Sequence, residues 1–247
     1  MAEVRRFPLP PALQRAMTLL ADAPADPQVS RGYLDLLDGA GEAGAPQNTG
    51  AIQKLWASSF GSLFYDNAQA LGRRLLEAWQ HPIDWLNIPA GGVALDVGCG
   101  PGSITASLAG AVGADGLALG IDVSKPMLAR AVRVQAGSQT AFLRADAQRL
   151  PLRDNTVDAV ISIAMLQLIP DPAVALAEMG RVLKPGGRIA LMVPTAGSAS
   201  RMWRLLPKAG ARVFDDDEIA DTLESHGFTS VRAKNYGTIQ WVRAKRI

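Results

Sequence analysis

Hydrophobic and polar positions follow two different patterns along the chain, and the pattern changes near residue 91. From Gly91 onward, short apolar runs alternate with segments whose apolar residues recur every three or four positions. The short apolar runs are typical of buried strands, and the segments with apolar residues every three or four positions are typical of amphipathic helices. Strands are predicted at 93–97, 117–122, 141–146, 157–166 and 187–194, and helices at 103–112, 124–135 and 171–183. Alternating strands and helices predict a parallel sheet that is covered on both faces.

The last third of the chain continues with a helix and two further strands. Three acidic residues begin a helical segment at 215–227, and Gly227 ends it. Two short runs, 229–234 and 238–245, follow each other closely, so we expect them to pair antiparallel at the edge of the sheet.

Residues 1–90 show helical periodicity and no clear strand. Helices are predicted at 9–24, at 26–41 with Asp26 as its cap, and at 62–80. We therefore divide the chain into a helical extension at 1–90, which is expected to act as a lid and substrate-binding element, and an α/β domain at 91–247.

The candidate chemistry lies in the turn after the first strand of that domain, in "ALDVGCGPGSIT". Its pattern is Asp96-x-Gly98-x-Gly100-x-Gly102, which differs from the dinucleotide pattern because Ser103 stands where the third glycine belongs. An aspartate beside the turn would repel a pyrophosphate and would attract an ammonium group. No Gly-Lys-Ser/Thr follows, which excludes a P-loop.

Asp122 ends the second strand, where an acid can accept hydrogen bonds from a ribose diol. A ligand that combines a ribose with a positively charged amino-acid tail fits both aspartates. S-Adenosylmethionine has both parts.

Four segments resemble, in order and spacing, the motifs of class I S-adenosylmethionine-dependent methyltransferases. They are "ALDVGCGPGSIT", "LGIDVSKPML", "LRADAQRLPLRDNTVDAVIS" and "MGRVLKPGGRIAL", within residues 90–195. The nearest resemblance is to the methyltransferase type 11 branch, with the C-methyltransferases of ubiquinone and menaquinone biosynthesis. It implies an α/β fold with a Rossmann-like, doubly wound, seven-stranded sheet that is mostly parallel and has an antiparallel edge strand.

The resemblance also implies a cofactor site. Residues that would face the methionine part, or shape the turn and pocket around it, are Asp96, Gly98, Cys99, Gly100, Gly102 and Ile163. Residues that would hold the adenosine part are Asp122, Val123, Met127, Asp146 and Ala147. The Cys99 side chain is expected to pack as a small apolar group, and Asp146 has an alternative role as a helix cap.

The sequence departs from the family at two positions. Many relatives carry histidine where this chain has Gln167, and Asn or Ser where it has Ile163. The sequence therefore offers no convincing general base. Tyr65 and His81 are candidate catalytic residues, although Tyr65 equally fits a core aromatic and His81 a surface position. Further candidates for the walls of an acceptor pocket are Trp56, Phe64, Trp79, Met202 and Trp203.

Charge and composition exclude several classes of binding partner. A net charge of +2 gives no footprint for nucleic acid, and Arg243, Lys245 and Arg246 are interpreted as a solvated edge strand. One cysteine excludes an internal disulfide, and we expect no metal site, signal peptide or transmembrane segment. A soluble cytoplasmic protein is expected, and a homodimer is left open.

The expected function is methyl transfer from S-adenosylmethionine to a small, fairly apolar acceptor such as a quinone, polyketide or lipid-like product, leaving S-adenosylhomocysteine. Two alternatives stay open: a non-catalytic homologue that binds the cofactor and serves as a partner or regulatory subunit, and an NAD-dependent oxidoreductase on the same kind of sheet.

Overall fold

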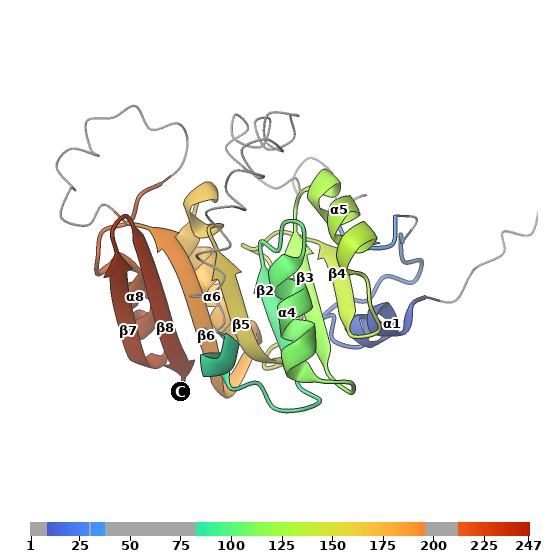
Figure 1. Cartoon of the computed structure of the whole chain (residues 1–247), viewed down its shortest axis with the longest axis horizontal. Coiled ribbons are helices and arrows are strands. Elements are labelled where there is room, and N and C mark those ends of the chain that lie inside the picture. The colour runs from blue at the N-terminus through green and yellow to red at the C-terminus, as the bar shows by residue number, and fades with distance from the viewer. Residues whose placement is uncertain (1–8, 30, 38–82, 196–211) are drawn as a thin grey trace, which may run out of the picture.

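The computed structural model of the protein describes residues 9–29, 31–37, 83–195 and 212–247, and these residues build one sheet between two layers of helices (Figure 1). The strand order is β1-β4-β3-β2-β5-β6-β8-β7. Strands β1 to β6 pair in parallel, and β8 pairs antiparallel with both β6 and β7. The bounds are β1 Leu34–Asp35, β2 Val93–Val97, β3 Leu117–Asp122, β4 Thr140–Arg144, β5 Val157–Ile163, β6 Leu183–Pro194, β7 Phe228–Tyr236 and β8 Ile239–Arg246.

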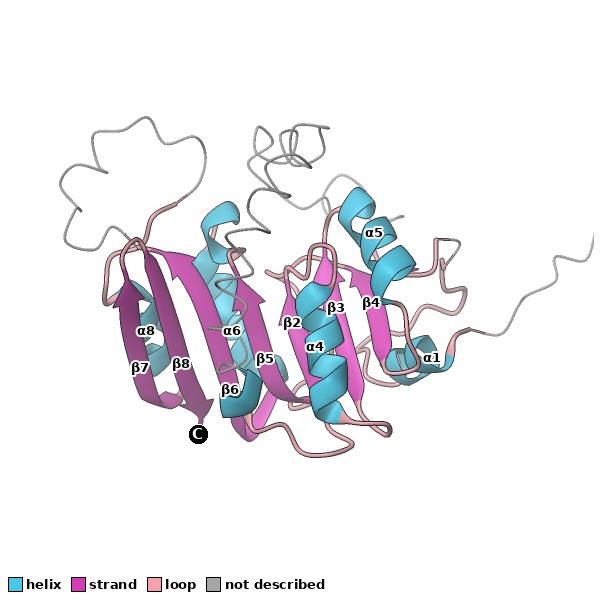
Figure 2. Ribbon diagram, viewed as in Figure 1, coloured by secondary structure: helices cyan, strands magenta, loops and turns pink. Residues whose placement is uncertain are grey.

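Helices cover both faces of the sheet (Figure 2). On one face lie α4 (Ser103–Val112), α5 (Lys125–Gln135) and a helical turn at 83–86. On the other lie α1 (Pro11–Met17), α6 (Pro172–Val182) and α8 (Glu218–Ser225). A short 3₁₀ helix, η2 (Leu166–Leu168), follows β5. The predicted α/β class and doubly wound architecture are confirmed.

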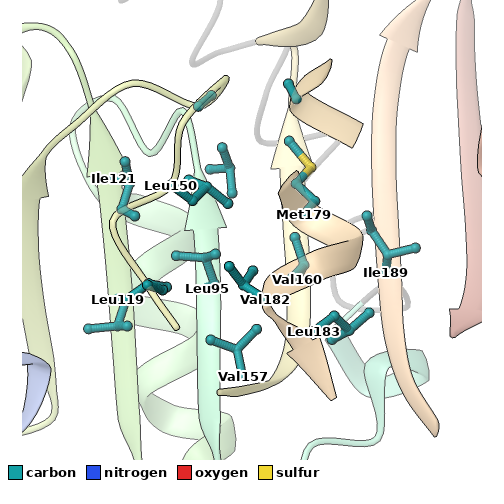
Figure 3. Close-up of a cluster of buried hydrophobic side chains, with 14 of the residues drawn as sticks. Leu95, Leu119, Ile121, Leu150, Val157, Val160, Met179, Val182, Leu183 and Ile189 are labelled. Atoms are coloured by element: carbon teal, nitrogen blue, oxygen red, sulfur yellow. The ribbon is translucent and has the colours of Figure 1, made fainter. Parts of the chain in front are cut away.

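The largest core lies between the sheet and the layer that contains α6. Figure 3 shows Met179 and Val182 of α6 beside Leu95 and Val160 of the central strands. Strands β2 and β3 are buried along nearly their whole length, because helices pack on both of their faces. This explains their continuous apolar runs, which lack the alternation of a half-exposed strand.

The sheet has eight strands rather than seven, because the two-residue strand β1 adds to the free edge of β4. This corrects the predicted helix at 26–41, of which residues 26–29 and 31–37 are described and contain no helix. Gly32 has a φ of +80°, and a Cβ there would lie 2.7 Å from Val132. The next two residues, Tyr33 and Leu34, are buried, so tertiary packing outweighs the local helical pattern.

Most of the other predicted elements appear at nearly the expected positions, including α8 and the antiparallel pair β7–β8. The helix predicted at 9–24 is limited to α1, Pro11–Met17, and the helix predicted at 62–80 lies outside the described residues. The "LKPGG" turn, 183–187, is the start of the long strand β6, with a register shift where Leu183 pairs with Val157 and Arg188 with Ala159. None of the described helices has the length and hydrophobicity to cross a membrane. The predicted division at residue 90 stays a prediction.

Candidate functional site

The candidate site lies at the carboxyl ends of the parallel strands, where the strand order reverses around β2. Strand β2 pairs with β3 on one side and with β5 on the other. A reversal of this kind leaves a crevice above the strand ends, which is where ligands bind in open α/β sheets. The turn 98–102, Asp122 and Ile163 follow or end these three strands.

The glycine turn is fixed to the end of β3 by backbone hydrogen bonds. The N–H groups of Gly98 and Cys99 both donate to the carbonyl of Ile121, at 2.8 and 3.0 Å. Gly98, Gly100 and Gly102 have φ values of +78°, +51° and +81°, in the left-handed region that favours glycine. The glycines are therefore required by the conformation of the turn itself.

The three glycines differ in what surrounds them. A Cβ at Gly98 would lie 2.4 Å from Cγ of Met165, and one at Gly102 would lie 2.9 Å from the ring of Phe142. A Cβ at Gly100 would meet nothing within 4 Å among the described residues. Gly98 and Gly102 thus permit close packing, Gly102 against Phe142 of β4, whereas no atom of the described residues lies next to a Cβ at Gly100.

Asp122 connects the end of β3 to the glycine turn. Its Oδ2 accepts a hydrogen bond from the Gly100 N–H at 2.9 Å, and its Oδ1 accepts one from the Ser124 N–H at 2.8 Å. Burial raises the pKa of this carboxyl, while the hydrogen bonds from Ser124 and Gly100 oppose the rise. Each carboxylate oxygen retains further acceptor capacity, so a diol could bind without breaking either bond.

Asp96 lies deeper, at the end of β2, and is 2% exposed. Its Oδ2 accepts a hydrogen bond from the hydroxyl of Thr105, at 2.7 Å. Burial raises the pKa of Asp96 to about 7, the Thr105 hydrogen bond counteracts this, and the Asp122 carboxylate adds to it. A buried acid with this pKa would be favoured in its ionised form by a nearby cation.

The role of Thr105 as the hydrogen-bond donor to Asp96 was not predicted from the sequence. The pattern that could have indicated it is a hydroxyl side chain in the helix that directly follows the turn.

Cys99 is buried against Tyr33, Leu128, Ala131 and Phe142, as expected for a small apolar side chain. Burial raises the pKa of its thiol well above the ordinary value, and the carboxylates of Asp122 and Asp96 add to the rise. The thiol is therefore protonated at neutral pH and is no nucleophile.

Val123 and Met127, predicted beside the adenine, follow β3 and are both partly exposed. The Val123 carbonyl accepts a hydrogen bond from Nε of Arg144 at 3.0 Å, and Arg144 forms an ion pair with Asp35 of β1 at 3.0 Å. Strand β1 thus supports the loop that carries Val123 through Arg144. Sequence reasoning missed this support, because no local pattern links Asp35 to a residue 109 positions away.

Asp146 and Ala147 follow β4, with Ala147 buried and Asp146 partly exposed. Oδ1 of Asp146 accepts a hydrogen bond from the Gln148 N–H at 2.9 Å, so the acid shapes its own turn. The end of this loop is held by Glu178, whose Oε2 accepts from the Leu150 N–H at 2.8 Å. A role of Asp146 toward adenine stays a prediction.

Apolar side chains predominate at the carboxyl end of β5. Ile163 packs against the core under α4 and is partly exposed. Gln167, in η2, donates from Nε2 to the carbonyl of Ala164 at 2.8 Å, while its buried Oε1 has no hydrogen-bond partner among the described residues. An unpaired buried carbonyl oxygen is costly, so this atom would be stabilised by any hydrogen-bond donor that reached it.

Ala164 adopts a φ of +54°, although it is neither glycine nor asparagine. Its N–H donates to the Met192 carbonyl at 2.9 Å, which holds the strained conformation in place. We expect Ala164→Gly to raise the free energy of unfolding by about 0.5–1 kcal/mol, because glycine carries no left-handed penalty and the exposed methyl group contributes little.

Urea unfolding of both proteins measures this difference. Ala233→Gly, at an exposed position of β7 where φ is not positive, is the matched control and should lower the free energy of unfolding by a similar amount. A loss of stability in both variants would contradict the prediction.

Several predicted residues lie outside the described part of the chain. These are the catalytic candidates Tyr65 and His81 and the candidate wall residues Trp56, Phe64, Trp79, Met202 and Trp203. The structure does bring together the turn at 98–102 with Asp96 and Asp122, as the sequence predicted.

Comparisons with known proteins agree with this geometry. A family model described as a methyltransferase domain matches residues 95–191. The chain is 43% identical over 105 residues to the demethylmenaquinone methyltransferase of Bacillus licheniformis, which is 42% of this chain and 45% of that protein. The chain therefore aligns with less than half the length of this relative.

Two other matches extend further. The demethylmenaquinone methyltransferase of Staphylococcus haemolyticus is 30% identical over 187 residues, 65% of this chain and 78% of that protein. The crystal structure of a SAM-dependent methyltransferase from Aquifex aeolicus covers 68% of this chain and 89% of its own, with a TM-score of 0.57 and 25% identity. By its similarity to the Staphylococcus haemolyticus relative, of which it covers more than two thirds, the chain belongs to the class I S-adenosylmethionine-dependent methyltransferase family.

Proposed function

We propose that this chain binds S-adenosylmethionine at the carboxyl ends of β2 and β3 and transfers its methyl group to a small, fairly apolar acceptor by in-line displacement. The observation that carries the proposal is the pair of carboxylates, Asp96 and Asp122, beside a turn in which no described atom lies within 4 Å of a Cβ at Gly100.

The residues present fit the cofactor in shape and charge. Open space at Gly100 lets a ligand approach the backbone closely, which a side chain would prevent. Asp96 is placed to attract the positively charged amino-acid part, since a nearby cation would favour its ionised form. Asp122 has acceptor capacity left for the ribose hydroxyls. Val123, Met127, Asp146 and Ala147 would hold the adenine.

Methyl transfer of this kind needs orientation more than it needs a nucleophilic residue. When bound, the cofactor supplies an electrophilic methyl group on a sulfonium. The chain's task is to align donor and acceptor, which can contribute roughly 7–11 kcal/mol to lowering the barrier, and to exclude water. We propose that the segment of the extension between β1 and residue 83, which contains the candidates Tyr65 and His81 for contact with the reactants, closes over the site for that purpose. Helix α1 and strand β1 are packed into the core and the sheet and would take no part in closure.

The acceptor we propose is a quinone, polyketide or lipid-like molecule. Ile163 ends β5, Met165 follows it and Met192 of β6 pairs with Ile163, so apolar side chains gather here, and an apolar molecule is bound mainly by such side chains. Two relatives carry the name demethylmenaquinone methyltransferase, which supports a quinone.

Calorimetric titration with S-adenosylmethionine, S-adenosylhomocysteine and NAD tests the cofactor. We expect Asp122→Ala to weaken binding of the first two about 100-fold, since the ribose loses its acceptor and the Gly100 and Ser124 N–H groups lose theirs. Asp115→Ala is the matched control: it removes one exposed carboxylate just before β3 and should change the affinity less than about twofold.

Binding of NAD alone would overturn the proposal in favour of an oxidoreductase. Binding of S-adenosylmethionine without methyl transfer to any acceptor of a quinone, phenol and fatty-acid panel, followed by mass spectrometry, would favour the non-catalytic alternative. Methylated product from one class of acceptor would identify the substrate class.

A further inference from the structure

A second concave feature lies on the sheet near the start of β6, away from the carboxyl ends that form the candidate site. It is a pocket of about 300 Å³ whose lining is basic and contains no acidic side chain among the described residues; the lining residues are Trp85, Arg188, Ser230, Arg232, Arg243 and Lys245. In Figure 1, α6 and α8 lie behind β6, β8 and β7, and the pocket belongs to the opposite face, with the helical turn at 83–86.

The strand register brings the basic residues together. Arg188 of β6 lies directly opposite Lys245 of β8, and Arg243 of β8 lies directly opposite Arg232 of β7. Like charges in directly opposed positions destabilise a sheet. No ion pair joins any of these four residues to an acid in the described part of the chain. A bound anion would relieve this repulsion.

Trp85 holds two of the guanidinium groups in position. The Cζ atoms of Arg188 and Arg243 lie 5.2 and 5.3 Å from the centroid of its ring. Arg188 also donates from Nη1 to the Trp85 carbonyl at 2.6 Å. Guanidinium groups fixed in this way lose less conformational entropy when they bind an anion, and their planar array of N–H groups matches phosphate oxygens.

A bulge in β7 completes the lining. The register between β7 and β8 shifts between Thr229 and Arg232, and Ser230 within it has a φ of +54°. A bulge redirects side chains, and here it places Ser230 in the wall of the pocket. Its hydroxyl adds a neutral hydrogen-bond donor to the four cations.

We propose that this pocket is an anion-binding site for a phosphate-type group that carries two or more negative charges. Four cationic side chains in about 300 Å³ match a phosphate monoester or a diphosphate in charge and size. The strand order corrects the interpretation of Arg243, Lys245 and Arg246 as residues of an edge strand, because β8 lies between β6 and β7, although Arg243 and Lys245 are exposed as expected. The same chemistry is offered by a free phosphate compound and by the headgroup of an anionic lipid.

The first test titrates the full chain with inorganic phosphate and with diphosphate in a calorimeter. The second measures its sedimentation with vesicles of phosphatidylcholine alone and with vesicles that also contain phosphatidylglycerol. We expect diphosphate to bind more tightly than phosphate, and the double variant Arg232→Gln/Lys245→Gln to weaken binding about tenfold or more. Neither of these exposed residues contacts the ring of Trp85 in a cation–π pair. The matched control, Arg31→Gln/Arg133→Gln, removes two exposed charges elsewhere and should change the affinity less than about twofold.

The arms of the experiment separate the two sources. Binding of free diphosphate that the double variant loses supports a soluble ligand, and sedimentation only with phosphatidylglycerol that the variant loses supports a lipid headgroup. Absence of binding in every arm, or equal binding by the wild type and the double variant, overturns the proposal. The melting temperature gives a second readout: diphosphate should raise it in the wild type and not in the double variant, compared with chloride at equal ionic strength.

Discussion

Asp96→Asn should make the cofactor-free protein more stable at pH 8 and should at the same time weaken its binding of the cofactor. In the wild type, folding raises the pKa of this buried carboxyl from 3.8 to about 7. Because the folded protein binds this proton more tightly than the unfolded chain does, the protonated carboxyl favours folding. That contribution to the free energy of unfolding is complete below pH 3.8 and is lost as the pH rises to about 7. The loss has an upper limit of about 4 kcal/mol, and asparagine avoids it because it never ionises. The Thr105 hydroxyl can donate to the amide oxygen as it does to the carboxylate.

Urea unfolding at pH 5 and pH 8 measures this effect. The wild type should lose stability between the two pH values relative to Asp96→Asn, and the two curves should converge toward low pH. Asp115→Asn, at an exposed position, should follow the wild type at both pH values. If Asp96→Asn were less stable than the wild type by the same amount at both pH values, the Asp96 carboxyl would not ionise near pH 7 in the folded protein.

The affinity for S-adenosylhomocysteine, measured by calorimetry at pH 8, should fall about 100-fold in the same variant, because the amide no longer offers a negative charge to the ammonium group. The wild type would then keep a destabilising acid in its core for the sake of binding, which is the usual exchange between stability and function at a site. Unchanged affinity would remove Asp96 from the proposed cofactor site without affecting the stability prediction.

Much of the fold could be predicted from the sequence because it depends on local pattern. Strand β3 and helix α4 begin and end at the predicted residues, since a buried strand between turns and a glycine-flanked helix are both local signals. The glycine turn was predictable for a similar reason: the three left-handed conformations require glycine at fixed spacing, and an acid lies at or next to the last residue of each neighbouring strand.

Contacts between distant segments could not be predicted in this way. Strand β1 consists of two residues whose place is fixed by packing against β4 and α5, so the helical pattern of 26–41 was misleading. The ion pair between Asp35 and Arg144 and the basic pocket around Trp85 join residues that are far apart in the sequence. A small net charge likewise conceals how the strand register concentrates Arg232, Arg243 and Lys245 on one face.

Two alanine substitutions in the glycine turn should separate folding from binding. Gly98→Ala is expected to lower the free energy of unfolding by about 3 kcal/mol, because alanine at a φ of +78° costs about 1–2 kcal/mol and its Cβ would lie 2.5 Å from Cβ of Met165. That neighbouring atom is part of a short, stiff segment of the side chain and cannot move aside without shifting the backbone. Urea unfolding measures the loss.

Gly100→Ala should lower the free energy of unfolding by only about 1–2 kcal/mol, since the φ of +51° is strained for alanine but no described atom lies within 4 Å of the new Cβ. The same open space is where we propose the cofactor binds, so the methyl group should reduce the affinity for S-adenosylhomocysteine about tenfold or more in calorimetry. If Gly100→Ala bound the cofactor as the wild type does, the ligand would not approach the turn at Gly100, and the proposed site would lose the observation that supports it most directly. The two variants lie two residues apart and make the same chemical change, so a difference between them must come from what each Cβ meets.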